Sequence, residues 1–361
     1  MKIRIAQNPG GGIALIIVMI VIIVLGILAG GFAYSMRVET ALARRADSEP
    51  DLEWLGRSGV EMARYILAQQ MTVPNEPYDA LNQKWAGGPG SIYSMTNEAL
   101  SQISLENNEL GKGRFSIKIL DQERKFNINV ASESILQQAL LLVGIDPTSS
   151  SMIVDSILDW RDPDDNPHLN GTESDYYLQL DPPYVAKNAP IDDLSELLLI
   201  RGITPEAYWG SRREDVRGSR FQTVSSGLPL NGAPLSYQVG LADLFTSISG
   251  RLINANTASA KVLQLVPGID ENMAAAIIQQ RSGPDGIDGT EDDIPFRSPQ
   301  EIPMPGAGPQ SAARLNNLFT VRSATFRVEV DAEVGQIKKR FVALVRRNGA
   351  RDIQMLYMHT N

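Results

Sequence analysis

The sequence contains no cysteine and only two histidines, His168 and His359, among 361 residues. Without cysteine the chain has no disulfide bonds, no thiolate metal sites and no cysteine nucleophile. Two histidines leave little material for a zinc site or for histidine-based acid–base catalysis. These absences lower the expectation of most enzyme classes.

Basic residues are also fewer than acidic residues. The chain has 33 Lys and Arg residues against 42 Asp and Glu residues, a net charge of -9 and a pI of about 4.9. Nucleic-acid phosphates are bound by basic surfaces, so no nucleic-acid partner is expected. The 43% hydrophobic and 21% charged content lies in the globular range, and the length allows one to three domains.

The N-terminus carries one long apolar run, from Ile13 to Phe32, with no charged residue between Arg4 and Arg37. A helix of about 20 residues spans roughly 30 Å, which is enough to cross a bilayer. Lys2 and Arg4 precede the run. The positive-inside bias therefore predicts a single-pass segment with a cytoplasmic N-terminus and the bulk of the chain on the other side.

Three glycines, Gly10 to Gly12, stand directly before the apolar run. They suggest a leader of residues 1–12 that a membrane peptidase removes between Gly12 and Ile13. Two alternatives stay open: a secretory signal peptide cut after Gly31-Phe32-Ala33, and a plain membrane anchor. A basic leader that ends in glycine before an apolar helix resembles the type IV pilin and pseudopilin superfamily.

The chain departs from that family's pattern at the start of the mature helix. The pattern has Phe first and Glu fifth after the cut, whereas this chain has Ile13 and Ile17. A carboxylate in a bilayer is costly unless the charged amine of a neighbouring subunit pairs with it. The absence of Glu at position 17 therefore favours a specialised subunit over a bulk filament subunit. The resemblance also implies that prepilin peptidase is the processing enzyme and that Ile13 is N-methylated.

Hydrophobic periodicity predicts the rest of the fold. A helical stripe continues to about Gln70, with Pro50 expected to kink or divide the helix. Its members are Leu52, Leu55, Gly59, Met62, Ala63, Ile66 and Leu67. Alternating residues predict strands at 115–120, 326–334 and 337–345, the last two joined by a turn at Gly335-Gln336. The early strand is expected to pair with the late ones.

These elements predict an α+β protein with a pilin-like fold, in which a long N-terminal helix packs on an antiparallel sheet and a large all-α domain is inserted into that sheet. The predicted parts are the leader 1–12, the N-terminal helix 13–70 with its membrane segment 13–36, the first part of the sheet domain 71–126, the insert 127–320 and the C-terminal strands 321–361.

The predicted insert contains an internal repeat. Residues 126–132 (FNINVAS) match residues 253–259 (INANTAS), an offset of 127, and Gly144-Ile145-Asp146 matches Gly268-Ile269-Asp270. The pattern resembles helix-hairpin-helix units, which often grip DNA backbones. Here Asp146 and Asp270 stand where phosphate would approach, so a scaffold for protein contacts is the better interpretation.

Acidic residues crowd the loop after the second helix of the first repeat. The six candidates are Asp159, Asp162, Asp164, Asp165, Glu173 and Asp175. Hard oxygen ligands at this density suit Ca²⁺, which takes six to eight oxygens, although the EF-hand pattern is missing. On the residues alone, a calcium site and a solvated acidic loop are equally favoured. The second repeat carries weaker metal candidates, namely Asp285, Asp288, Glu291, Asp292 and Asp293.

Four motifs in order make the resemblance more specific. They are Asp159-Trp160-Arg161-Asp162, residues 171–177 (GTESDYY), residues 194–205 with LSEL and IRGITP, and residues 253–258 (INANTA). Together they resemble the minor pseudopilin K family of the type II secretion system.

That resemblance implies a non-enzymatic subunit of the inner membrane with its bulk in the periplasm and Ca²⁺ in its acidic loops. Such a subunit sits at the pseudopilus tip with minor pseudopilins I and J, where it initiates or caps assembly for protein export across the outer membrane. Secreted cargo and the secretin are further candidate partners. The alternative is a membrane-anchored periplasmic hydrolase that uses the acidic loops.

Processing at the glycine-ended leader can be tested directly. Gly12→Asp should leave an unprocessed protein in the membrane, because the peptidase is expected to need the small residue before the cut. The mature wild-type protein should begin at Ile13 in N-terminal sequencing. A start at Tyr34 would instead support the signal-peptide interpretation.

Overall fold

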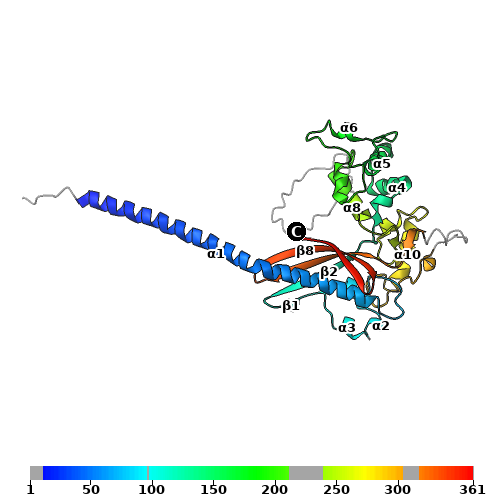
Figure 1. Ribbon diagram of the computed structural model, residues 1–361, viewed down its shortest axis with the longest axis horizontal. Helices are drawn as coiled ribbons and strands as arrows, with labels where there is room; N and C mark the ends of the chain where they lie inside the picture. The colour runs from blue at the N-terminus through cyan, green and yellow to red at the C-terminus, as the bar shows by residue number, and fades with distance from the viewer. Residues whose placement is uncertain (1–10, 96, 211–238, 304–316, 361) are drawn as a thin grey trace, which may run out of the picture.

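The computed structural model describes residues 11–95, 97–210, 239–303 and 317–360. Within them, a long helix projects from a body made of one antiparallel sheet and a helical region beside it (Figure 1). Residues 1–10 of the predicted leader lie outside the described residues, as do residues 211–238 and 304–316 of the predicted insert.

Helix α1 (Gly11–Gln70) is continuous over 60 residues, and its N-terminal half extends away from the body (Figure 1). Its end at Gln70 agrees with the predicted stripe. The predicted division at Pro50 is wrong, because Pro50 lies inside the helix. Pro50 is exposed, so water can hydrate the carbonyl that lacks an N–H partner there.

The sheet has the strand order β1-β2-β7-β8-β9, and every neighbouring pair is antiparallel. The strands are β1 (Asn108–Leu110), β2 (Gly113–Asp121), β7 (Thr325–Val334), β8 (Ile337–Gly349) and β9 (Asp352–Thr360). Strand β2 pairs with β7 in a register that sets Ile117 opposite Val330. The early strand therefore pairs with the late ones, as predicted, whereas β9 was not singled out by the sequence.

The C-terminal half of α1 packs on one face of this sheet. Leu52, Leu55, Ala63, Ile66 and Leu67 are buried there in one core cluster with strand residues such as Phe115, Val330 and Phe341. Two glycines allow the close approach: a Cβ on Gly56 would lie 2.5 Å from the ring of Phe341, and one on Gly59 would lie 2.5 Å from Val330. The helical stripe of the sequence is thus the sheet-facing surface.

Shorter elements fill the remainder of the described chain. Before β2 come η1 (Lys84–Ala86), α2 (Ile92–Met95) and α3 (Glu98–Ser101). Between β2 and β7 come β3 (Phe126–Asn127), η2 (Ile128–Val130), α4 (Glu133–Val143), α5 (Pro147–Arg161), α6 (Ser174–Tyr177), η3 (Leu194–Leu199), α7 (Pro205–Trp209), α8 (Leu241–Leu244), β4 (Phe245–Thr246), β5 (Ile253–Asn254), α9 (Ala260–Leu263), α10 (Glu271–Arg281), η4 (Pro299–Glu301) and β6 (Phe319–Thr320).

This stretch has a hydrophobic core separate from the core under α1. The sequence predicted an all-α insert, and this prediction is wrong. Strand β3 pairs with β4, and β5 pairs with β6, in two short parallel ribbons. Strands of two residues are too short to show an alternating pattern. The sequence therefore carried no signal for them.

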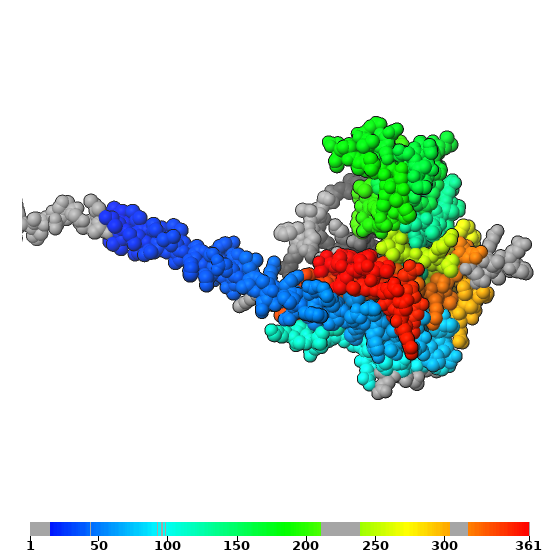
Figure 2. Space-filling view, in the orientation of Figure 1, coloured from blue at the N-terminus to red at the C-terminus, as the bar shows by residue number. Residues whose placement is uncertain are grey.

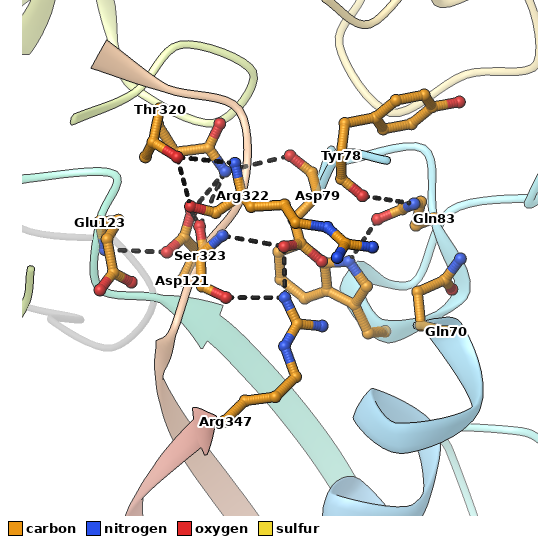
Figure 3. Close-up of polar contacts among 12 residues, drawn as sticks. Gln70, Tyr78, Asp79, Gln83, Asp121, Glu123, Thr320, Arg322, Ser323 and Arg347 are labelled. Atoms are coloured by element: carbon orange, nitrogen blue, oxygen red, sulfur yellow. Dashed lines mark hydrogen bonds and ion pairs between the residues drawn. The ribbon is translucent and has the colours of Figure 1, made fainter. Parts of the chain in front are cut away.

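A buried carboxylate joins the helical region to the sheet. Asp121 ends β2, and its Oδ2 accepts hydrogen bonds from Asn254 Nδ2 at 3.2 Å, Thr257 Oγ1 at 2.5 Å and Ser323 Oγ at 2.7 Å. Its other oxygen accepts the Glu123 N–H at 2.8 Å. Asp121 thus contacts the second repeat through Asn254 and Thr257. It also contacts the chain that returns to the sheet through Ser323, which lies beside it in Figure 3.

An ion pair completes this junction. Arg347 of β8 and Asp79 are both buried and form a salt bridge (Figure 3). Asp79 Oδ2 also accepts the Ser323 N–H at 2.8 Å, and its backbone carbonyl accepts from Asn254 at 3.0 Å. The segment before β2, the sheet and the insert therefore meet in one polar network.

The junction predicts a pH-dependent stability. Burial, and then the charge of Glu123, raises the pKa of Asp121 from 3.8 to about 8. A raised acid pKa stabilises the folded state fully below about pH 4, and this contribution is lost as the pH rises towards 8. Asp121→Asn should keep a neutral polar group and flatten the pH dependence.

Asp121→Leu should instead cost about 3 kcal/mol, because it leaves buried donors without an acceptor. Denaturant unfolding of the three proteins in detergent at pH 5 and pH 8 measures both effects. An Asp121→Asn protein that loses stability with pH as steeply as the wild type would contradict the assignment to Asp121.

Candidate metal centre

The candidate site lies in the internal repeat. In each of its two copies, an arginine at the end of a helix donates hydrogen bonds to two backbone carbonyls. At the end of α5, the guanidinium of Arg161 donates hydrogen bonds to the carbonyls of Ile128 and Ala131. At the end of α10, Arg281 donates to the carbonyls of Ala255 at 2.7 Å and Ala258 at 2.8 Å. The acceptors in the two copies are 127 residues apart, which is the offset of the sequence repeat.

An asparagine in each copy makes a second matching contact. Asn129 donates to the carbonyl of Ile191 at 2.8 Å and accepts its N–H at 2.7 Å. Asn256 donates to the carbonyl of Phe296 at 2.9 Å and accepts its N–H at 2.8 Å. The sequence repeat is therefore a structural repeat, and the acidic loops occupy the same place in both copies.

In the first copy the loop folds back on Asp159, a fully buried residue in the last turn of α5. The Oδ1 atom of Asp159 accepts the His168 N–H at 3.0 Å and pairs with the imidazole of His168. The Oδ2 atom accepts the Thr172 N–H. A Cβ on Gly171 would lie 1.9 Å from Oδ2, so only glycine lets the loop approach this carboxylate.

Several oxygens around Asp159 are buried and have no hydrogen-bond partner among the described residues. They are both carboxylate oxygens of Glu173, Oδ1 of Asp162 and Oδ1 of Asn188. Buried polar atoms are normally satisfied, so four unpaired acceptors in one region need a donor or a cation. Burial, followed by the charges of Asp159 and Asp162, raises the pKa of Glu173 to about 7.

Asp164 and Asp165 lie on the exposed side of the cluster. Their charges also raise the pKa of Glu173. Asp165 accepts a hydrogen bond from Asn188 Nδ2 at 3.3 Å, and Asp164 accepts the Asn166 N–H at 3.0 Å. The structure thus gathers five of the six predicted carboxylates. Asp175 is exposed in the first turn of α6.

Two residues of this centre were not predicted. Asn188 follows the acidic run by many residues, and its left-handed backbone with φ of 48° turns its side chain onto Asp164 and Asp165. His168 carried no signal in the repeat, because Gly171-Thr172-Glu173 matches Gly289-Thr290-Glu291 and sets Asn170 opposite Asp288. One ligand-capable atom each of Asp159, Asp162 and His168 lies within 4.8 Å of the others.

In the second acidic loop, the chain itself supplies partners for the carboxylates. Arg281 forms a salt bridge with Asp288 at 2.7 Å, and Asp293 accepts the Gly289 N–H at 2.8 Å. Asp292 accepts the Asp285 N–H at 3.0 Å and the Thr290 hydroxyl at 2.8 Å, which lowers its pKa. Glu291 is exposed. The weaker candidates therefore do not present the unpaired buried oxygens of the first loop.

The donor set of the first loop fits a hard divalent cation. Carboxylate and amide oxygens are the ligands that Ca²⁺ prefers, in sites that vary in geometry. Asp162, Glu173 and Asn188 would supply the unpaired oxygens, with Asp164 and Asp165 at the rim. Asp159 is already occupied by the His168 and Thr172 groups, so its role would be to hold the loop in place.

The long N-terminal helix packed on an antiparallel sheet is a pilin-like fold. The chain superposes on a chain of the crystal structure entitled "The Crystal Structure of the GspK-GspI-GspJ complex from enterotoxigenic Escherichia coli Type 2 Secretion System". The TM-score is 0.62 at 17% identity, over 88% of this chain and 99% of that chain. A family model described as "Type II secretion system (T2SS), protein K" matches residues 113–211.

Two relatives extend this match. The type II secretion system protein K of Pseudomonas aeruginosa is 28% identical over 78% of this chain and 75% of its own length. That of Klebsiella pneumoniae is 24% identical over 55% of this chain and 59% of its own length, less than two thirds. These matches agree with the resemblance to type II secretion system protein K that the sequence motifs suggested.

Proposed function

We propose that this chain is a non-enzymatic minor pseudopilin of the type II secretion system, held in the inner membrane by α1 with its bulk in the periplasm. Among the described residues, α1 is the one helix long and apolar enough to cross a membrane, and its most apolar stretch, of mean hydropathy 3.1, makes no burying contact with the body. A surface of this kind needs lipid or other apolar helices around it. This observation carries the proposal.

The partners follow from the relatives. The matching chain belongs to a complex of GspK with GspI and GspJ, so counterparts of minor pseudopilins I and J are the proposed partners here. Prepilin peptidase would cut between Gly12 and Ile13, after which Ile13 would be methylated.

A position at the tip of the pseudopilus is favoured by shape and by sequence. The described residues between β2 and β7 stand beside the sheet as a second body (Figure 1), which adds width that a thin filament could not repeat at every subunit. Ile17 provides no carboxylate for a subunit above it. Both features suit a subunit that starts or caps assembly.

Assembly provides the test of this function. Full-length protein should co-purify from detergent-solubilised membranes with two smaller pilin-like proteins encoded beside it, each carrying a glycine-ended leader. Deletion of its gene should abolish secretion across the outer membrane, and Gly12→Asp should not restore it. Purification of the chain without any pilin-like protein, together with unimpaired secretion in the deletion strain, would overturn the proposal.

The first acidic loop is proposed to hold Ca²⁺ through Asp162, Glu173 and Asn188, with Asp164 and Asp165 nearby. The support is the set of buried oxygens that lack a partner. A cation bound only to the folded state stabilises it by RT ln(1 + [L]/Kd). For an extracellular-type site, millimolar Ca²⁺ would add roughly 0.4–1.4 kcal/mol.

Chelation should therefore lower the melting temperature of the wild-type protein, and added Ca²⁺ should restore it. In chelator at pH 8, above the raised pKa of Glu173, the Glu173→Gln protein should melt higher than the wild type because it lacks a buried charge among carboxylates, and it should respond less to Ca²⁺. Glu291→Gln in the second loop is the matched control and should respond like the wild type. An equal melting temperature with and without Ca²⁺ in all three would favour a solvated acidic loop.

A further inference from the structure

The insert and the sheet have separate hydrophobic cores, and a polar junction joins them. The chain passes from β2 into the insert over residues 121–126 and returns to β7 over residues 320–325. Figure 2 shows the part of the insert drawn in green rising from the body, whose C-terminal strands are red. Two bodies with separate cores move relative to each other unless the contacts between them hold them in place.

An open cleft of about 350 Å³ separates the two bodies beside this junction. The sheet contributes Arg327, Leu344 and Tyr357 to its lining, and the insert contributes Asp192, Tyr208 and Asp243. The two bodies are therefore not packed tightly against each other on this side. The insert has room there to change its angle to the sheet, so the junction decides its position.

The junction buries more negative than positive charge. Three of its carboxylates, those of Asp79, Asp121 and Glu123, belong to residues that are at most 3% exposed, and the guanidinium of Arg347 belongs to a residue that is 5% exposed. Arg347 forms its salt bridge with Asp79. The guanidinium of Arg322 is directed to the carbonyl of Glu76 at 3.5 Å. Asp121 and Glu123 therefore lie together without a cation of their own.

These two carboxylates hold both passages of the chain. Glu123 accepts the Thr325 N–H at 3.0 Å through one oxygen and the Gly250 N–H at 2.9 Å through the other. The groups that reach Asp121 from the second repeat and from the returning chain are the uncharged side chains of Asn254, Thr257 and Ser323. Two neighbouring buried carboxylates cannot both ionise at low cost, so one of them holds a proton.

The direction of the pH effect follows from Asp121. Burial, then the charge of Glu123, raises its pKa in the assembled junction to about 8, and the charge of Asp79 adds to this effect. In water the pKa of an aspartate is close to 3.9. A proton therefore favours the closed junction over one in which Asp121 is hydrated. Between these two values the ratio of open to closed molecules rises about tenfold per pH unit, and above pH 8 it levels off.

We propose that the insert is hinged on the sheet at residues 121–126 and 320–325, and that a proton held between the buried carboxylates of Asp121 and Glu123 keeps this hinge closed. Loss of the proton in an alkaline medium releases the second repeat and the returning chain together. The insert then lifts from the sheet and the cleft opens, while α1 and the sheet stay packed. The hinge goes beyond the proposed function and does not depend on it.

Hydrogen exchange of the full-length protein in detergent tests the release. Rates are read by mass spectrometry and divided by the intrinsic rate at each pH. Protection of the amides in residues 253–257 and 321–325 should fall about tenfold per pH unit between pH 6 and pH 8. Amides in the middle of β2 and β7 should keep their protection. An equal loss in these strands would mean unfolding of the whole body and would overturn the hinge.

Three amide substitutions identify the titrating group. Asp121→Asn stays neutral, so its junction amides should show the same protection at pH 6 and pH 8. Glu329→Gln is the matched control on β7, where Glu329 pairs with Arg327 at 3.1 Å outside the junction, and it should respond like the wild type. Glu173→Gln should also respond like the wild type at the junction. Loss of the response in Glu173→Gln, or an unchanged response in Asp121→Asn, contradicts the proposal.

Spin labels test whether the insert moves, because the chain contains no cysteine. One label is placed on β2 through Lys118→Cys and one on α4 through Leu141→Cys, two exposed positions. Their distance distribution should be narrow at pH 6 and gain a longer component at pH 9. With Asp121→Asn added, it should stay narrow at both pH values. Reduced protection without any change in this distance would mean local fraying of the junction, and the hinge would be refuted.

Discussion

The contact on which the rest of the body depends is the buried carboxylate of Asp121. It receives hydrogen bonds from Thr257 in the second repeat and from Ser323 on the chain that returns to the sheet. One side chain at the end of β2 therefore holds both the insert and its exit beside the sheet. Both donors are buried, so removal of the carboxylate would leave the Thr257 and Ser323 hydroxyls without their acceptor.

The first asparagine of the repeat, Asn127 in one copy and Asn254 in the other, makes a different contact in each copy. Asn127 of the first copy donates to the carbonyl of Ser249 at 2.9 Å, a contact within the insert. Asn254, its equivalent, donates to Asp121 and Asp79 at the sheet. Within each copy, the arginine at the helix end and the second asparagine keep the same contacts. The repeat thus forms a small unit whose first asparagine joins it to whatever lies next to it.

The sequence predicted the elements whose residue patterns extend over several periods, and it missed those with short or non-periodic patterns. The stripe from Leu52 to Leu67 and the alternation in β2 and β7 extend over several periods, so their burial and pairing could be predicted. The short ribbons and the polar junction could not, because Asp79, Asp121 and Arg347 lie far apart in sequence and carry no periodic signal. The acidic run was visible as composition. Which oxygens stay unpaired, and that Asn188 joins them, depends on a loop conformation that composition does not encode.

The two acidic loops differ in their hydrogen-bond partners and in their place relative to the sheet. Helix α10 lies next to the sheet, whereas α5 and α6 lie at the far end of the insert (Figure 1). Near the sheet, Arg281 supplies the cation for Asp288 from within the chain. At the far end, Arg161 donates to the carbonyls of Ile128 and Ala131, the imidazole of His168 pairs with Asp159, and both oxygens of Glu173 have no hydrogen-bond partner among the described residues. If the first loop holds Ca²⁺ as proposed, the folding of the second copy, which attaches the insert to the sheet, would not depend on calcium. The distal copy alone would respond to calcium, so calcium loss would loosen the outer end of the insert while the pilin-like body and its junction stayed intact.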